Sequence, residues 1–414
     1  RFYGKEVASL FDGEYSGLYR LGTVIDNEAM LAELQRAMAG DSDFFDGFAT
    51  DPGNAELSGE DSFTFKEDIF AGYLMATARF GQAQIIGGGR VGSTNNEIDA
   101  YILDEVQGAH FATDKSDFVN VLPSIHLNYD LDDRTRVRAA IWTSFARPDI
   151  ARMSSAREYG YDSDPDGDGK LNPKNEWVLV AVEQGNPDLK PMKAINYDLS
   201  VERYNGDTGA YSLGLFYKDI ENFLYRSSSS NIRDGTAGVN VGPDGVTVSM
   251  PNNGKWARVY GVEVSAQQIF HWLPGPLSAL GASVNLTLQN SEAETGISWH
   301  PQGYTLPLME TPEAVANIQV FWARNGWEAY AAYSYQSQFL EGIQAFGNNP
   351  YEQDYEFVDL NVRRKLWKGA TASLQVQNLF DNHTYWYTAG ASTGASRAYI
   401  KNGRSISLGL TYVF

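Results

Sequence analysis

Residues 403–414 read GRSISLGLTYVF, and apolar side chains recur at every second position from Ile406 onward. Successive side chains of an extended strand point to opposite faces. One face therefore carries Ile406, Leu408, Leu410, Tyr412 and Phe414, and the other carries Ser405, Ser407, Gly409 and Thr411. A strand with one apolar and one polar face suits lipid on one side and water on the other, as in an outer-membrane barrel.

The same alternation recurs upstream, beginning at Phe63. For example, Leu213, Leu215 and Tyr217 alternate with Ser212, Gly214 and Lys218. The strands are joined alternately by short and long connections. The short ones, which carry turn residues, lie near 81, 132–133, 206–209, 274–276, 325–326 and 368–369, and the long ones span 105–117, 149–190, 227–255, 294–310, 341–352 and 382–398. Six connections of each kind predict thirteen strands with the asymmetric hairpins of a barrel.

Aromatic side chains stand beside every short turn. They are Phe80, Tyr129, Tyr204, Trp272, Trp322, Trp327 and Trp367. A soluble β-sandwich would also alternate, but aromatic residues at one end of successive hairpins are typical of the ring at a membrane interface. We therefore predict an all-β fold, a transmembrane antiparallel β-barrel with long extracellular loops and short periplasmic turns.

The direction of the strands adds a prediction about the whole barrel. If short turns are periplasmic, the strand entering at Phe63 and the final strand both run inward, so both are even-numbered. Residues 63–414 then form about the last 13 of 22 strands, a number found in plugged transporters. Residues 1–62 are predicted to be an extracellular loop with a short helix over 27–39, and the N-terminal plug and first strands are absent from this sequence.

Composition excludes several classes of protein. The net charge of −20 argues against nucleic-acid binding, which requires a basic surface. The chain has no cysteine, so disulfides and thiolate chemistry are excluded. No run of about 18 apolar residues is present, which excludes a helical membrane span. Residues 390–394 match a nucleophile elbow, but no histidine follows them, so we predict that the protein is not an enzyme.

Short motifs in the chain resemble those of TonB-dependent outer-membrane receptors. The family's C-terminal signature is similar to Asn378-Leu379-Phe380-Asp381 together with Gly403-Arg404 and the ending at Phe414. Segments 121–124, 144–148, 185–191, 196–200 and 216–220 follow in the family's order. Within the family, the chain looks closest to the subgroup common in Caulobacter-like and Sphingomonas-like bacteria, many of which import oligosaccharides.

This resemblance implies a location, a function and partners. The protein is expected in the bacterial outer membrane, in contact with its lipid. It is expected to import a ligand with energy supplied by the inner-membrane protein TonB acting through the missing plug. The ligand is expected to be an oligosaccharide or other small molecule. A siderophore receptor, an outer-membrane enzyme and an adhesin-like barrel are the alternatives.

An acidic motif in the long connection 149–190 predicts a calcium site. Hard oxygen ligands suit Ca²⁺, and closely spaced carboxylates repel one another without a cation. The expected ligands are Asp162, Asp164, Asp166, Asp168 and Asn172. From Asp164 the spacing follows an EF-hand-type loop, but the twelfth position is Asn175, with Glu176 next to it, which leaves the last ligand open.

Aromatic residues in the long connections are candidates for ligand contact. Aromatic faces with polar neighbours suit sugar rings, which stack on them and form hydrogen bonds at the rim. The residues expected to bind substrate are Glu176, Trp177, Trp256, Trp299, Tyr385, Trp386 and Tyr387. For any one of them, packing between loops is an equally good explanation. An anionic iron chelate would favour a basic vestibule, whereas this chain is acidic.

Overall fold

The structure is a computed structural model that describes residues 32, 35–36, 63–104, 108–155, 157–162, 178–206, 208–232, 246–297, 301–343, 349–389 and 395–413. Contacts divide the chain into two compact units, one of residues 1–64 with 99–113 and one of residues 65–98 with 114–414. Of the helix predicted over 27–39, the described residues Ala32, Gln35 and Arg36 are helical and exposed. The rest of segment 1–62 lies outside the described residues, and the division at residue 62 stays a prediction.

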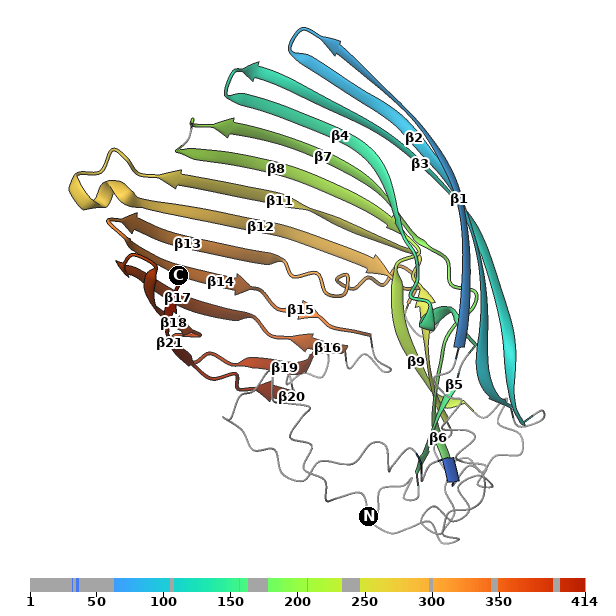
Figure 1. Ribbon diagram of the computed structural model, residues 1–414. Helices are drawn as coiled ribbons and strands as arrows, with labels where there is room; N and C mark the ends of the chain where they lie inside the picture. The colour runs from blue at the N-terminus through green and yellow to red at the C-terminus, as the bar shows by residue number, and fades with distance from the viewer. Residues whose placement is uncertain are drawn as a thin grey trace. The chain divides into compact units, whose positions relative to one another are not determined.

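The described residues contain a 13-stranded sheet, and the prediction of thirteen strands is confirmed (Figure 1). Neighbouring strands from β3 to β21 are antiparallel. Across the sheet the order is β1 (Phe63–Phe80), β2 (Ala83–Asp104), β3 (Gly108–Asp132), β4 (Thr135–Ala146), β7 (Met192–Tyr204), β8 (Gly209–Glu221), β11 (Trp256–Ile269), β12 (Leu280–Glu294), β13 (Ala314–Arg324), β14 (Trp327–Gln336), β17 (Tyr355–Trp367), β18 (Ala370–Gln377) and β21 (Ser405–Tyr412).

The short turns have the chemistry that the sequence predicts. Asn325 and Gly326 connect β13 to β14 with φ values of 51° and 76°. Two positive φ angles in a two-residue loop are the geometry that matches the twist of a hairpin, and Asn-Gly adopts it most readily. The connection between β11 and β12 contains the short 3-10 helix η3 (Gly275–Ala279).

Five of the six long connections lie where they are predicted, and the described parts of four of them contain strands. In two of these connections, β5 (Arg157–Asp162), β6 (Val178–Gln184), β10 (Val246–Asn253) and β9 (Leu224–Ile232) form a four-stranded sheet. In two others, β15 (Phe339–Leu340), β16 (Asn349–Glu352), β19 (Thr384–Ala389) and β20 (Ala395–Ile400) form another. The 3-10 helix η2 (Ala151–Met153) precedes β5. Each small sheet therefore joins two long connections into one structure.

The prediction of a long connection over 105–117 is wrong, because β2 ends at Asp104 and β3 already begins at Gly108. Cross-strand polar pairs explain the difference. Lys115 Nζ lies 2.8 Å from Glu97 Oε2, and Thr113 Oγ1 donates a hydrogen bond to Asp99 Oδ1 at 2.5 Å. Opposite charges and hydroxyls that face each other stabilise paired strands, so the polar composition of this segment does not end them.

The two faces of the sheet differ as the alternation predicts. Residues directly opposite in an antiparallel pair lie on the same face. The register sets Ile141 beside Tyr197 and Leu199 beside Leu215, and all four are exposed. The other face is polar, and near the long connections it is covered by a buried apolar cluster that includes Phe223, Leu306 and Leu340. Among the described residues, no helix has the length and apolarity of a membrane span.

Candidate functional site

The strand β19 carries three consecutive aromatic residues, Tyr385, Trp386 and Tyr387, all expected to bind substrate. Aromatic residues favour strands, and here they pair with aromatic or acidic residues of β16 and β20. We call Tyr351, Glu352, Tyr385, Trp386, Tyr387 and Tyr399 together the aromatic loop sheet. The structure thus brings three of the predicted residues into one group.

The pair of Tyr385 and Tyr399 is the most accessible part of this group. Their ring centroids lie 5.9 Å apart with an interplanar angle of 27°, and the residues are 44% and 64% exposed. His383 lies beside Tyr385, with ring centroids 6.2 Å apart. Exposed, stacked rings present a flat apolar face with hydroxyl groups at its edge, which suits a ring-shaped ligand that carries polar groups.

The pair of Tyr351 and Tyr387 is more enclosed. Their rings stack with centroids 5.9 Å apart, and the Tyr387 hydroxyl donates a hydrogen bond to Gln338 Oε1. Burial raises the pKa of the Tyr351 hydroxyl, and nearby Tyr387 and Tyr304 raise it further. Tyr351 also packs against the buried apolar cluster, so this pair anchors the sheet.

Glu352 supplies an acidic group to the aromatic loop sheet. It faces Trp386 in the register of β16 and β19. Burial raises the pKa of the Glu352 carboxyl, the nearby Glu341 raises it further, and a hydrogen bond with Trp386 opposes them. The carboxyl therefore holds its proton to a higher pH than an ordinary glutamate, and in the protonated form it both donates and accepts hydrogen bonds.

Trp256 lies on β11 rather than on the aromatic loop sheet. Its indole Nε1 donates a hydrogen bond to Glu294 Oε2 at 3.0 Å, and the Arg258 guanidinium lies 4.7 Å from its ring centroid. Lys255 Nζ lies 2.6 Å from the other oxygen of Glu294. The indole N–H and one region of the ring are therefore engaged within the protein.

The other predicted site residues cannot be placed. Glu176, Trp177 and Trp299 lie outside the described residues. The same is true of the calcium residues Asp164, Asp166, Asp168 and Asn172, whereas Asp162 ends β5 without a described side chain. Within the described part of the chain, no group of three or more His, Cys, Asp or Glu residues could hold a metal ion. The calcium site stays a prediction.

A network of hydrogen bonds on the polar face of β3, β4 and β7 was not predicted from the sequence. Arg138 donates to both carboxylate oxygens of Glu202, at 2.8 and 3.2 Å, and to Asn128 Oδ1 at 3.0 Å. The Tyr204 hydroxyl donates to the same carboxylate at 2.8 Å. A hollow of about 320 Å³ beside this network is lined by Ile86, His126, Asn128, Arg138, Ala139, Ala140, Asp198 and Ser200. Alternation assigns Asn128, Arg138 and Glu202 to the polar face, but only the register brings them together.

Tyr399, Glu352 and Gln338 were also missed as members of the site. Residues 382–398 read as a long connection, and the pairing of β19 with β20 is what sets Tyr399 against Tyr385. The available signal was local: Thr384 and Thr388 flank the aromatic run Tyr385-Trp386-Tyr387, a composition that favours a strand.

Known proteins resemble this chain in sequence and in fold. The family model for TonB dependent receptor-like, beta-barrel proteins matches residues 2–379. The iron-regulated outer membrane virulence protein of Vibrio cholerae serotype O1 is 25% identical over 315 residues, which cover 75% of this chain and 40% of that protein.

Two solved structures share the fold. The unliganded ferric citrate transporter FecA matches with a TM-score of 0.57 and 15% identity, covering 84% of this chain and 45% of that chain. The copper transporter OprC matches with a TM-score of 0.54 and 16% identity, covering 84% of this chain and 48% of that chain. The chain thus spans less than half the length of these relatives.

Proposed function

Because the chain belongs to the family of TonB-dependent receptor-like β-barrels, we propose that it is part of a receptor that imports a ligand with energy from TonB. Its strands are those of an outer-membrane β-barrel, with an apolar face toward lipid. The family match, together with the 13-stranded sheet, is the observation that carries this proposal. TonB is the proposed partner and acts through a plug.

The proposed ligand is an oligosaccharide. The exposed stack of Tyr385 and Tyr399 offers aromatic faces, and Glu352, which faces Trp386 in the register, offers a carboxyl group on the same small sheet. Apolar stacking with hydrogen bonds at the rim is how proteins hold sugar rings. The net charge of −20 disfavours an anionic ligand.

A ferric siderophore is the second candidate, because the similar proteins carry iron-related names. The relative from Vibrio cholerae is iron-regulated, and FecA transports ferric citrate. OprC, with a comparable fold, is a copper transporter. The shared fold is therefore compatible with more than one ligand class, and residues in the long connections must decide among them.

Uptake by cells that express the full-length receptor tests both candidates. We expect energy-dependent uptake of labelled neutral oligosaccharides, lost when TonB is deleted. Tyr385→Ala and Tyr399→Ala should each raise the half-saturating concentration about tenfold, the equivalent of roughly 1.4 kcal/mol. Trp367→Ala, an exposed aromatic residue beside a short turn, is the control and should leave uptake unchanged.

Other outcomes of this experiment have clear meanings. Uptake of a radioactive ferric siderophore without uptake of any oligosaccharide would favour the second candidate. Uptake of neither ligand by a correctly inserted receptor would contradict the proposed import of these ligands.

We also propose that Ca²⁺ binds Asp162, Asp164, Asp166, Asp168 and Asn172 and orders the connection between β4 and β7. Calorimetry on the purified receptor should detect heat of calcium binding that the double variant Asp166→Ala and Asp168→Ala abolishes. Asp188→Ala, in the same connection but outside the motif, is the matched control. Equal heats from wild type and double variant would refute the site.

A further inference from the structure

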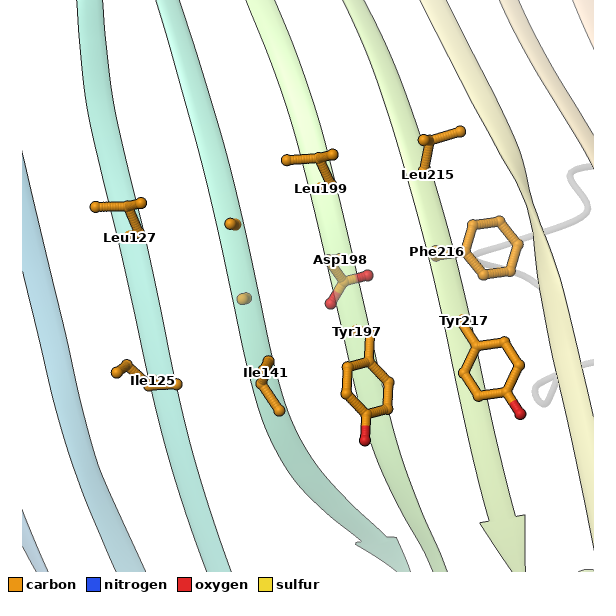
Figure 2. Close-up of a pocket in the computed structure, with 11 residues that line it drawn as sticks. Ile125, Leu127, Ile141, Tyr197, Asp198, Leu199, Leu215, Phe216 and Tyr217 are labelled. Atoms are coloured by element: carbon orange, nitrogen blue, oxygen red, sulfur yellow. The ribbon is translucent and has the colours of Figure 1, made fainter.

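The exposed apolar face of β3, β4, β7 and β8 contains a hollow of about 560 Å³ (Figure 2). Figure 2 shows Leu127, Leu199 and Leu215 in one row across it, and Ile125, Ile141, Tyr197 and Tyr217 in the next. Tyr197 and Tyr217 are in edge contact, with ring centroids 6.0 Å apart. Their row bounds the hollow on the side of the long connections.

The hollow forms because a small residue stands between large ones. The register sets Ala139 opposite Leu127 on one side and opposite Leu199 on the other. Opposed residues share a face, so the methyl group of Ala139 lies between two leucine side chains. The missing volume opens a depression in a face that otherwise carries branched and aromatic residues.

A charged residue continues the same face toward the short turns. On β7, alternate side chains from Tyr197 lead through Leu199 and Val201 to Arg203. Arg203 is the fourth residue after Leu199, about 13 Å further along the strand. The Arg203 side chain is 58% exposed; it donates to Thr135 Oγ1 at 2.7 Å and lies 3.7 Å from Asp132 Oδ2. An exposed ion pair of this length is weak, so further guanidinium donors can bind an anion.

We propose that this surface is a binding site for an anionic glycerophospholipid of the periplasmic leaflet. One acyl chain fills the hollow at Ala139, and the phosphate group binds Arg203. The site is continuous with the lipid-facing surface of the barrel, and short turns are periplasmic in such barrels. Burial of methylene groups and an arginine–phosphate hydrogen bond supply the affinity. The site is independent of the imported ligand.

Native mass spectrometry of the delipidated full-length receptor tests this site. Phosphatidylglycerol and a diacylglycerol with the same chains are the probes. Wild-type receptor should bind phosphatidylglycerol at least about tenfold more tightly than the diacylglycerol. This difference corresponds to the free energy of one charge-assisted hydrogen bond. Arg203→Gln should remove that preference. Ala139→Phe and the milder Ala139→Leu should weaken the binding of both lipids, because the larger side chain fills the hollow.

Two matched variants control for nonspecific effects. Arg324→Gln alters an exposed arginine at the short-turn end of β13. Ala331→Phe alters an alanine set opposite Val320 and Leu360. Both should bind lipid like the wild type. The proposal would be overturned if the controls lost as much lipid binding as Arg203→Gln and Ala139→Leu, or if those two variants bound lipid like the wild type. It would also be overturned if the receptor formed a dimer that Ala139→Leu dissociates.

Discussion

Replacing Leu213 with arginine is expected to reduce the folding free energy of the full-length receptor in a bilayer by about 1–3 kcal/mol, between the costs of arginine at the interface and at the midplane of a barrel's lipid face. Leu213 is 46% exposed and lies opposite Val201 and Val264. On the same face of β8 it stands between Tyr211 and Leu215. Denaturant unfolding of the receptor in lipid vesicles would measure this loss.

Ser212→Arg is the matched control on the same strand. Ser212 lies on the opposite, polar face, where the register sets it beside Glu202 and Ser265. An arginine there meets a carboxylate and water rather than hydrocarbon, so its cost should stay below about 1 kcal/mol. Equal destabilisation by the two variants would show that the faces are wrongly assigned, and with them the lipid-facing surface.

The sequence predicts those properties of the sheet that depend on neighbouring residues. Alternation identifies the faces, and Asn325-Gly326 with similar pairs marks the turns, because both signals are local. Thirteen strands follow from counting them. The total of 22 strands stays a prediction, because the sheet of this chain does not test it. The place of Phe414 on the apolar face of the last strand also stays a prediction, because Phe414 lies outside the described residues.

Features that depend on pairing between distant residues are not predictable in this way. The parallel pairing of β6 with β10, such as Val182 with Val248, joins two connections that the sequence presents as separate. The contacts of Arg138 with Glu202 and of Tyr385 with Tyr399 likewise require the register. The hollow at Ala139 has the same origin, since an alanine in a strand gives no sign of the leucines beside it.

Asn378→Ala is expected to destabilise the end of β18 by about 3 kcal/mol or more, because several hydrogen bonds converge on this side chain. Asn378 is 7% exposed; its Nδ2 donates to the carbonyls of Asn382 at 2.9 Å and Gly403 at 3.1 Å. Its Oδ1 accepts from the Asn382 amide at 2.8 Å. These bonds join the start of the last long connection to the residues before β21. Hydrogen exchange at the Asn382 amide and thermal unfolding of the receptor would measure the loss.

Asn325→Ala separates the hydrogen bonds from the backbone strain. Asn325 and Asn378 both have φ of 51°, a left-handed conformation that costs alanine about 1–2 kcal/mol. The Asn325 variant should show that cost alone, and Asn378→Gly should show the loss of the hydrogen bonds with little strain. If Asn378→Ala costs no more than Asn325→Ala, the side chain does not hold the connection. If Asn378→Ala costs more than Asn325→Ala, the difference measures the hydrogen bonds of the Asn378 amide. That amide joins Asn378-Leu379-Phe380-Asp381 to Gly403-Arg404 across 25 residues of chain, which explains physically why the two segments act together as one signature.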